Sequence, residues 1–369
     1  MVDSIKNFFV NMLTGAGAFT ALALIGVGFS DHLHPDDYPM MACLGLAFPF
    51  FLVANLIMFA LMIIVRWKRC WVPLLGFVFA YVPIRTYIPL HPSSAVPDSC
   101  LTIVSYNVAG YGGNYRYEKG VDTVVNYLRR INADIVCLQE DHGGKSESPV
   151  DSLKKLYPYN DTVHVEDPLN ALINAVGIHT RLPILRKQRI DYGSLANGTA
   201  VFYLQMDNGD TLIVINNHLE STHLSPTDRE RYKQALRGDM EQDEAKEEAL
   251  VLLEKMSEAM VKRAAQADSL HRFIAEHAGK PIIVCGDFND TPISYVRHTV
   301  AQGLTDCFVE SGCGLGLSFN QNGFNFRIDH IMCSDHFIPH NCRVDSRMNA
   351  SDHYPIMCWL QPRNTTTKP

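Results

Sequence analysis

The sequence predicts an α/β protein in which an α-helical membrane segment precedes a larger domain of alternating strands and helices. Short apolar runs recur between residues 101 and 360, and helical stretches such as Glu118 to Arg130 and Pro292 to Ala301 separate them. Long, nearly uncharged apolar stretches occupy residues 1–90. With 369 residues, 47% of them hydrophobic, the chain can bury one large core and still supply the additional segment.

Two apolar stretches, Phe8 to Phe29 and Met40 to Val65, are long enough to cross a bilayer, which takes about 20 apolar residues as a helix. A third, Trp71 to Leu90, contains Arg85 and three prolines, so a kinked span and an interfacial segment are both open. A signal peptide is the alternative for the first stretch, but no small-residue cleavage site closes it and a second apolar run follows. We therefore expect residues 1–90 to contact the lipid bilayer through two or three transmembrane helices.

The basic residues of this segment predict its orientation. Lys6 precedes the first stretch and Arg66-Trp67-Lys68-Arg69 follows the second, whereas the loop Ser30 to Pro39 holds acids and histidines but no Lys or Arg. By the positive-inside rule both basic sites are cytoplasmic and the loop is outside. If the third stretch also spans, the larger domain is extracytoplasmic. The sequence then predicts an integral protein of the inner or plasma membrane.

The remaining organisation follows from composition. We expect a membrane segment at 1–90, a short stiff linker at 91–99 that contains His91 to Pro97, a large domain at 100–361, and a polar tail at 362–369. The longest helical candidate, Thr227 to His277, is broken near Gly238-Asp239 and carries charges of both signs. Such charge mixing is typical of a solvated helix face, with a partner-binding arm as the alternative.

Within the large domain, polar side chains follow apolar runs. The pairs of run and polar residue are Leu101 to Val104 with Asn107, Asp134 to Leu138 with Glu140, Leu212 to Ile215 with His218, and Ile282 to Cys285 with Asp287 and Asn289. Runs of this kind are typical of strands buried on both faces, so the polar residues are predicted to lie at strand ends. Two further polar motifs are Arg327-Ile328-Asp329-His330 and Ser351-Asp352-His353.

These motifs, in this order and together with Gly177 to Ile184, resemble the endonuclease/exonuclease/phosphatase superfamily, which has the DNase-I-like fold. The resemblance covers Leu101 to Leu360. It implies a four-layer α/β sandwich, in which two mixed β-sheets pack face to face and helices flank them. It also implies a metal-dependent hydrolase that acts on phosphate ester bonds.

The resemblance assigns the metal ligands to oxygen donors. Glu140 is the first expected ligand, with Asn107 and Asp352 beside it, and Mg²⁺ or Mn²⁺ is the expected ion. A carboxylate at a buried strand end is unfavourable unless it is paired or bound to metal, so a structural ion pair is the alternative for Glu140.

The catalytic roles also follow from the resemblance. His353 matches the general base that activates water, and Asp329 matches the residue that holds its imidazole in the required tautomer. His218 and Asn289 are expected to donate to the phosphoryl oxygens as charge builds, and Asp287 to complete the metal or leaving-group side. The form His218-Leu219-Glu220-Ser221 departs from the abasic-site endonuclease branch. It is closer to DNase-like, sphingomyelinase-like and phosphoinositide-phosphatase-like members.

The charge of the chain restricts the class of substrate only in part. The net charge of −7 gives no general attraction for a polyanion, although Arg181, Arg186, Lys187 and Arg189 could form a local basic cluster. With membrane anchoring, a phosphodiester or phosphomonoester on a lipid head group or small phosphorylated metabolite is favoured. A membrane-tethered nuclease, which would bind nucleic acid, and a catalytically inactive binding protein are the alternatives. The sequence identifies no protein partner.

Overall fold

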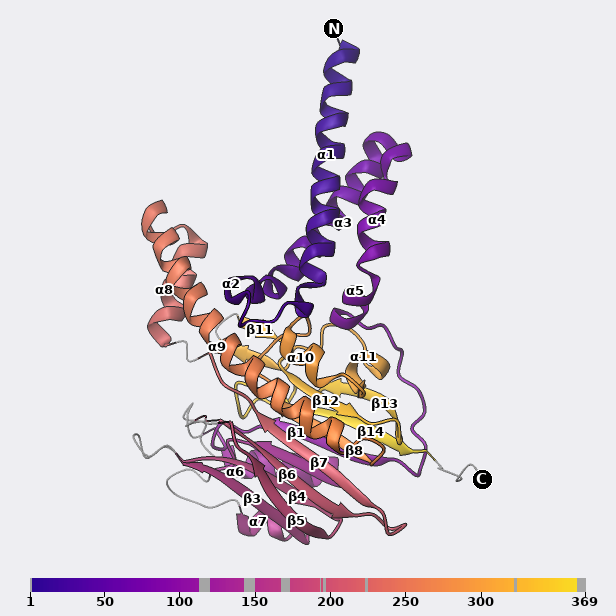
Figure 1. Ribbon diagram of the computed structural model, residues 1–369, viewed down its shortest axis with the longest axis vertical. Coiled ribbons are helices and arrows are strands. Elements are labelled where there is room, and N and C mark those ends of the chain that lie inside the picture. Colours follow the sequence, from indigo (N-terminus) through magenta and orange to yellow (C-terminus); the bar gives the residue numbers. More distant parts are fainter. Residues whose placement is uncertain are drawn as a thin grey trace. The chain divides into compact units, whose positions relative to one another are not determined.

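The protein is described by a computed structural model that covers residues 2–112, 120–142, 150–166, 173–192, 194, 197–222, 225–321 and 324–363 (Figure 1). The chain divides into two compact units. The first comprises Met1–Ile88, His223–Ala264 and Thr291–His298, and the second comprises Pro89–Thr222, Ala265–Asp290 and Thr299–Pro369.

The first unit begins with helices that match the apolar stretches. In chain order they are α1 (Val2–Gly28), the 3₁₀ helix η1 (Ser30–His32), α2 (Pro39–Ala42), η2 (Cys43–Ala47), α3 (Phe48–Arg66), η3 (Trp67–Arg69), α4 (Trp71–Phe79) and α5 (Tyr81–Tyr87). Two regions, Ser4–His32 and Pro39–Arg69, are long and apolar enough to be candidate membrane spans. Only 28% and 22% of their most apolar windows are buried. A core helix of a soluble domain would bury most of this surface.

The third apolar stretch is not one continuous helix. It forms α4 and α5, which meet at Ala80, and Pro73 and Pro83 each lie in the first turn of one of these helices. Proline is tolerated there because the first turn leaves its N–H groups without intrahelical partners. The prolines therefore divide the stretch into pieces of 9 and 7 residues.

Helices α1, α3 and α4 pack against one another through small residues and one buried amide (Figure 1). Asn55 on α3 is fully buried, and its Nδ2 donates to the carbonyl oxygen of Pro73 at 2.9 Å. Its Oδ1 accepts from the hydroxyl of Thr20 at 3.2 Å. A Cβ at Gly76 would lie 2.9 Å from the Cα of Ala21, so α1 and α4 are in close backbone contact.

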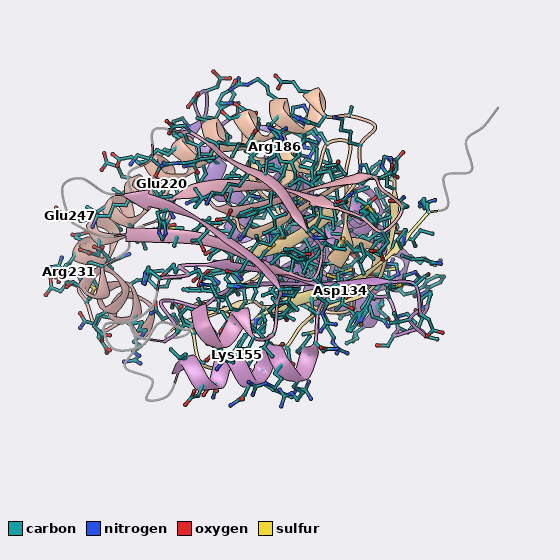
Figure 2. The ribbon with its side chains drawn as sticks, turned by 90° about the horizontal axis from the view of Figure 1, so that it is seen from below. Asp134, Lys155, Arg186, Glu220, Arg231 and Glu247 are labelled. Atoms are coloured by element: carbon teal, nitrogen blue, oxygen red, sulfur yellow. The ribbon has the colours of Figure 1, made fainter. Side chains whose placement is uncertain are left out.

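The rest of the first unit contains a helical hairpin. Helix α8 (Pro226–Arg237) ends at Gly238, whose φ of 74° closes the helix in the left-handed region, and α9 (Gln242–Glu276) follows. The break lies where the sequence predicted it. Ion pairs join the two helices: Arg231, shown in Figure 2, lies 2.7 Å from Glu248, and Lys255 lies 2.7 Å from Asp228.

The second unit is built on two six-stranded mixed sheets. The first sheet has the order β13-β14-β1-β2-β4-β3 and the second has the order β5-β6-β7-β8-β12-β9. The pairs β1/β2 and β7/β8 are parallel, and the other pairs within these two sheets are antiparallel. The strands of the first sheet are β1 (Leu101–Asn107), β2 (Ile135–Gln139), β3 (Tyr159–Glu166), β4 (Ile173–Thr180), β13 (Phe337–Val344) and β14 (Ile356–Pro362). Those of the second are β5 (Ile184–Ile190), β6 (Gly198–Gln205), β7 (Thr211–His218), β8 (Ile282–Asp287), β9 (Thr305–Asp306) and β12 (Asp329–Cys333).

Apolar side chains fill the space between the two sheets. Ile103 and Cys137 of the first sheet belong to the same fully buried cluster as Phe202, Val214 and Cys285 of the second. A second cluster packs the outer face of the first sheet against α6 (Gly120–Ile131). Further helices are α7 (Val150–Lys154), α10 (Tyr295–Val300) and α11 (Cys307–Ser311), and β10 (Phe319–Gln321) and β11 (Phe324–Phe326) form a small separate sheet. The predicted fold, two mixed sheets flanked by helices, is confirmed.

The segment predicted to be a linker is attached to the second unit. The N–H of His91 donates to the carbonyl of Gly312 at 3.1 Å. Ser94 exchanges two hydrogen bonds with the Asn341 side chain, at 2.9 and 2.7 Å. Residues 91–94 are therefore bound to the domain that follows them.

Candidate active site

The register of the strands brings the predicted residues to one edge of the two sheets. Asn107 at the end of β1 pairs with Gln139 at the end of β2, and His218 at the end of β7 pairs with Asp287 at the end of β8. Asp329 is the first residue of β12 and pairs with Asp287, because β12 runs antiparallel to β8. We call the eight predicted residues at this edge the strand-end site: Asn107, Glu140, His218, Asp287, Asn289, Asp329, Asp352 and His353.

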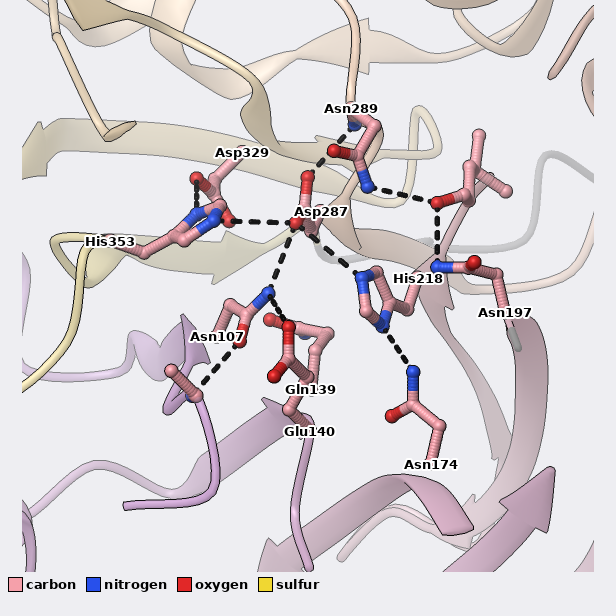
Figure 3. Close-up of polar contacts among 12 residues, drawn as sticks. Asn107, Gln139, Glu140, Asn174, Asn197, His218, Asp287, Asn289, Asp329 and His353 are labelled. Atoms are coloured by element: carbon pink, nitrogen blue, oxygen red, sulfur yellow. Dashed lines mark hydrogen bonds and ion pairs between the residues drawn. The ribbon is translucent and has the colours of Figure 1, made fainter. Parts of the chain in front are cut away.

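His353 lies between the carboxylates of Asp329 and Asp287, and Asp287 lies at the centre of the site (Figure 3). Its Nδ1 is 2.9 Å from Oδ2 of Asp329, and its Nε2 is 3.5 Å from Oδ2 of Asp287. Donor atoms of the three residues all lie within 4.8 Å of one another. Burial alone would lower the pKa of His353, but the carboxylates of Asp329 and Asp287 outweigh burial and raise it to about 10. The surrounding charges therefore favour a positive charge at this point.

A backbone hydrogen bond and complete burial of the side chain hold Asp329 in place. Its N–H donates to the hydroxyl of Ser318 at 3.1 Å, and its side chain is fully buried. Among the described residues its Oδ1 has no hydrogen-bond partner, whereas Oδ2 contacts His353. The ring of Phe319 packs edge-on against His353 with 5.0 Å between centroids, so the imidazole is restrained from a second side.

Asn107 connects two carboxylates. Its Nδ2 lies 3.2 Å from Oε1 of Glu140 and 3.1 Å from Oδ2 of Asp287, and its Oδ1 accepts from the N–H of Ala109. The amide nitrogen, rather than the oxygen that a cation needs, thus faces the acids in this arrangement. The role of Asn107 as a ligand remains a prediction, since a bound cation would favour the opposite orientation of the amide.

Glu140 sits in a tight turn directly after β2. Its φ of 52° places it in the left-handed region, and its carbonyl accepts from the N–H groups of Gly110 and His142 at 3.2 and 2.8 Å. Burial raises the pKa of its carboxyl group; the hydrogen bond from Asn107 lowers it, and the carboxylate of Asp352 raises it again. Two half-buried acids whose negative charges act on each other fit a divalent cation, because a dication would neutralise both.

Asp352 is positioned by the neighbouring serine. The hydroxyl of Ser351 lies 3.3 Å from Oδ1 of Asp352 and 2.8 Å from the carbonyl oxygen of Asn107. The hydroxyl oxygen of Ser351 also accepts a hydrogen bond from the N–H of His353 at 3.2 Å. Ser351 therefore links the turn that carries Asp352 and His353 to the end of β1.

His218 presents a donor to the site. Its Nδ1 lies 3.0 Å from the amide nitrogen of Asn174, and its Nε2 lies 3.8 Å from Oδ2 of Asp287. Because the Asn174 amide donates to Nδ1, the proton of the neutral ring is on Nε2. Burial lowers the pKa of His218, which favours this neutral form. Asn174 on β4 was not assigned a role from the sequence, since it lies at the start of its strand and not after an apolar run.

Asn289 is fixed at the turn after β8. Its N–H donates to Oδ1 of Asp287 at 2.8 Å, its φ is 52°, and its Nδ2 donates to the carbonyl of Leu219 at 2.9 Å. Asn197 donates to the same carbonyl at 3.0 Å. One amide hydrogen of Asn289 is thus used within the protein, and an amide has only one more for a substrate oxygen.

A buried polar network connects the two sheets beneath the site. Gln139 on β2 donates to Oδ1 of Asn216 on β7 at 2.6 Å. Asn216 in turn donates to the carbonyls of Leu138 and Gly177 at 3.0 and 2.9 Å. The sequence placed Gln139 and Asn216 next to predicted site residues but gave them no role. Hydrogen-bonded amides between sheets keep the two halves of the site in register.

The predicted basic cluster is already engaged with protein groups. Arg186, on the edge strand β5 (Figure 2), has its guanidinium carbon 3.6 Å from the centre of the Tyr203 ring. Lys187 pairs with Asp161, Arg181 donates to the side chain of Asn132, and Arg189 lies 3.9 Å from Asp191. Each of these four exposed cations therefore has a partner within the described part of the protein.

The sequence profile of the Endonuclease/Exonuclease/phosphatase family matches residues 104–353, which include the whole strand-end site. The chain belongs to this family, whose members are usually phosphoester hydrolases that use divalent metals. A second profile, described as a domain of unknown function (DUF8431), matches residues 8–87. No match was found among curated proteins.

Solved structures agree on the fold. The human Nocturnin catalytic domain with bound sulfate anion is 17% identical, with a TM-score of 0.50 over 75% of this chain and 99% of that one. An endonuclease/exonuclease/phosphatase from Bacteroides vulgatus is 16% identical, with a TM-score of 0.50 over 72% and 100%. One from Beutenbergia cavernae is 15% identical, with a TM-score of 0.50 over 72% of each chain. At these identities the similarity shows the fold of the second unit.

Proposed function

We propose that this protein is a membrane-anchored, divalent-metal-dependent phosphoesterase in which His353 activates water. The observation that carries the proposal is the placement of His353, with Nδ1 on Asp329 and Nε2 3.5 Å from Asp287. A general base needs one nitrogen held in a fixed tautomer and the other directed into the site. The ends of β1, β2, β7 and β8 and the start of β12 lie at the same edge of the two sheets, and β8 and β12 supply the two carboxylates beside this imidazole.

Each residue has a role in the proposed reaction. A cation bound beside Asp287 would offset the carboxylates that raise the pKa of His353 and so favour its neutral form. Nε2 of the neutral ring then takes the proton of the attacking water, while Asp329 accepts the Nδ1 hydrogen and stabilises the imidazolium that forms. Glu140, Asn107 and Asp352, with Asp287 beside them, would hold a Mg²⁺ or Mn²⁺ ion, which would supply neutralising charge to the phosphate oxygens. The Nε2 hydrogen of His218 and the free amide hydrogen of Asn289 are donated to those oxygens as negative charge builds.

The membrane part of the proposal rests on exposed apolar side chains. On α1 and α3, Phe19, Ile57 and Ile64 are 65%, 54% and 81% exposed, a costly arrangement in water and a favourable one in lipid. We propose that residues 1–90 anchor the chain and that the catalytic domain, residues 100–361, is extracytoplasmic. A reporter fused after residue 369 tests this: alkaline phosphatase should be active and a cytoplasmic fluorescent protein silent. The reverse pattern would place the domain in the cytoplasm.

The proposed substrate is a phosphate ester on a lipid head group or a small phosphorylated metabolite. The net charge of −7 and the engagement of Arg181, Arg186, Lys187 and Arg189 by protein groups weigh against a long polyanion. A tethered nuclease is the second candidate, since the fold family also contains nucleases. A binding protein without activity is disfavoured because residues competent for each catalytic role occupy the site.

A substrate panel tests the proposal. The full chain in detergent is incubated with Mg²⁺ and, side by side, a bis-aryl phosphate, sphingomyelin, phosphoinositides, nucleotides and nucleic acid. His353→Ala serves as the control for contaminating hydrolases. Turnover of a lipid or small metabolite that His353→Ala abolishes would support the proposal. Selective cleavage of nucleic acid would favour the nuclease, and no turnover of any substrate would favour the binding protein.

A further inference from the structure

Three potential metal ligands gather in the first unit, on residues that the proposed reaction does not use. Asp31 and His32 lie in η1, at the end of the first candidate span, and His298 lies in α10. Donor atoms of Asp31, His32 and His298 are all within 4.8 Å of one another. We call these three residues the loop cluster.

Packing independent of the histidines holds the loop cluster together. Ile293, shortly before α10, is buried in the same apolar cluster as Leu24, Val27 and Phe48 of the helices. The approach is tight: a Cβ on Gly45 would lie 1.8 Å from the carbonyl oxygen of Ile293. The position of His298 above η1 is therefore set by the helix packing and does not depend on its contact with Asp31.

The carboxylate of Asp31 makes one hydrogen bond, to His32, and one longer contact, to His298. Asp31 is 8% exposed, and each of its carboxylate oxygens faces an imidazole Nδ1: His32 at 2.7 Å and His298 at 3.6 Å. The second distance is too long for a good hydrogen bond. It is close to the roughly 3.3 Å that separates two ligands of a tetrahedral zinc ion with bonds of about 2.0–2.1 Å.

The two imidazoles also direct the same atom towards one point. The rings of His32 and His298 are 4.3 Å apart between centroids, and Nδ1 of each faces the Asp31 carboxylate. Neither histidine is fully buried, since their side chains are 54% and 32% exposed. An ion can therefore enter, and water can complete its coordination.

We propose that Asp31, His32 and His298 bind a divalent cation of the zinc class. One carboxylate and two imidazoles are ligands that suit Zn²⁺, Co²⁺ and Ni²⁺ better than Mg²⁺. The bound ion would join the end of the first candidate span to α10 and so stabilise the first unit. This site shares no residue with the strand-end site, and its existence does not depend on the proposed phosphoesterase activity.

The test uses the full chain in detergent with the background substitutions Glu140→Gln and His353→Ala, which weaken any zinc binding at the strand-end site. Zn²⁺ affinity is measured by calorimetry, and coordination by the visible spectrum of Co²⁺. His32→Ala and His298→Ala are compared with His34→Ala, a histidine in the same loop that contacts Tyr295 and Asp36 and lies outside the cluster. His298→Cys supplies a different zinc ligand at the same position.

We expect one Zn²⁺ per chain in the background protein and after His34→Ala. His32→Ala and His298→Ala should each weaken binding by at least ~10-fold, because losing a ligand exceeds the effect of losing an outer partner. Zn²⁺ should raise the unfolding temperature of the background protein but not of these two variants. His298→Cys should keep the ion and add a thiolate charge-transfer band with Co²⁺. Absence of zinc binding, or equal losses in all three alanine variants, would overturn the proposal and leave His32 as a hydrogen-bond partner of Asp31 and His298 as its neighbour.

Discussion

Polar side chains are buried in the strand-end site, whereas apolar side chains are exposed along α1 and α3. Asp287, Asp329 and His353 are each at most 4% exposed, while Phe19 and Ile57 are more than half exposed. In water alone, both arrangements would cost free energy. We infer from this difference that each region is adapted to a partner other than bulk water. In our account the partner is a cation with a phosphate ester at the site, and lipid along the helices.

The largest effect on activity should come from substituting the buried polar residues of the strand-end site. We expect His353→Ala and Asp329→Asn each to lower kcat by roughly 10²-fold or more, the range for loss of a general base. KM should change less than kcat, because the pair acts on water and not on ground-state binding. Steady-state kinetics of the full chain on a bis-aryl phosphate measures both constants.

The double variant, His353→Ala with Asp329→Asn, tests whether the two residues act together. Residues that act as one unit are not additive, so the double variant should be little slower than His353→Ala alone. If the two losses simply multiply, the residues act independently, and the role of Asp329 as the partner of His353 would have to be abandoned.

The next largest effect should come from placing a charged residue among the exposed apolar side chains of α3, and it should appear as weaker insertion into the membrane. Ile57 lies in the middle of α3 and Leu250 lies on α9, and both are more than half exposed. If α3 is in lipid, Ile57→Lys should disfavour insertion by about 2.5–3.5 kcal/mol, while Leu250→Lys should change stability by less than about 0.5 kcal/mol. The share of the chain that resists alkaline extraction from membranes reports the difference. Equal behaviour of the two variants would show that exposure on α3 does not mean contact with lipid.

A smaller difference is expected between alanine substitutions at two glycines that both have a positive φ. Gly286 precedes Asp287 and has a φ of 130°, and a Cβ there would lie 2.0 Å from the carbonyl oxygen of Asn217. Gly209 has a φ of 87° and open space around it. Both changes to Ala carry a backbone cost of about 1–3 kcal/mol, and Gly286→Ala adds ~1–3 kcal/mol from the clash.

Thermal unfolding of the two glycine variants measures this difference. Gly286→Ala should also lower turnover, since it displaces the strand end that carries Asp287, whereas Gly209→Ala should leave turnover unchanged. A Gly286→Ala protein as stable and active as Gly209→Ala would mean that the β7/β8 contact does not constrain the site.

The sequence predicted the fold class well because its signals are local. Uniform apolar runs predict buried strands, and Asn107, His218 and Asp287 do lie at strand ends because each follows such a run. The order of the motifs then predicted the sandwich through the family resemblance. The two long apolar stretches also became long helices, since length and lack of charge are sufficient to identify such segments.

Other features depended on contacts between distant residues and could not be read locally. Asn174 and Gln139 became part of the site or its support only through strand pairing and sheet packing. Asp329 begins its strand instead of ending it, because β12 runs antiparallel to β8. The closeness of Asp31 and His298, 267 positions apart in the numbering of the sequence, follows from helix packing around Ile293. No pattern of neighbouring residues encodes that distance.

The most direct test of the central claim is the turnover of a bis-aryl phosphate by the full chain in Mg²⁺ and in excess EDTA. Wild-type protein, His353→Ala and Glu140→Gln are prepared identically in detergent. Our account predicts that wild-type turnover requires Mg²⁺, ceases in EDTA and returns when Mg²⁺ is restored, while both variants are slower by roughly 10²-fold or more. Full wild-type activity in excess EDTA, or variants as active as wild type, would contradict a metal-dependent hydrolase at the strand-end site.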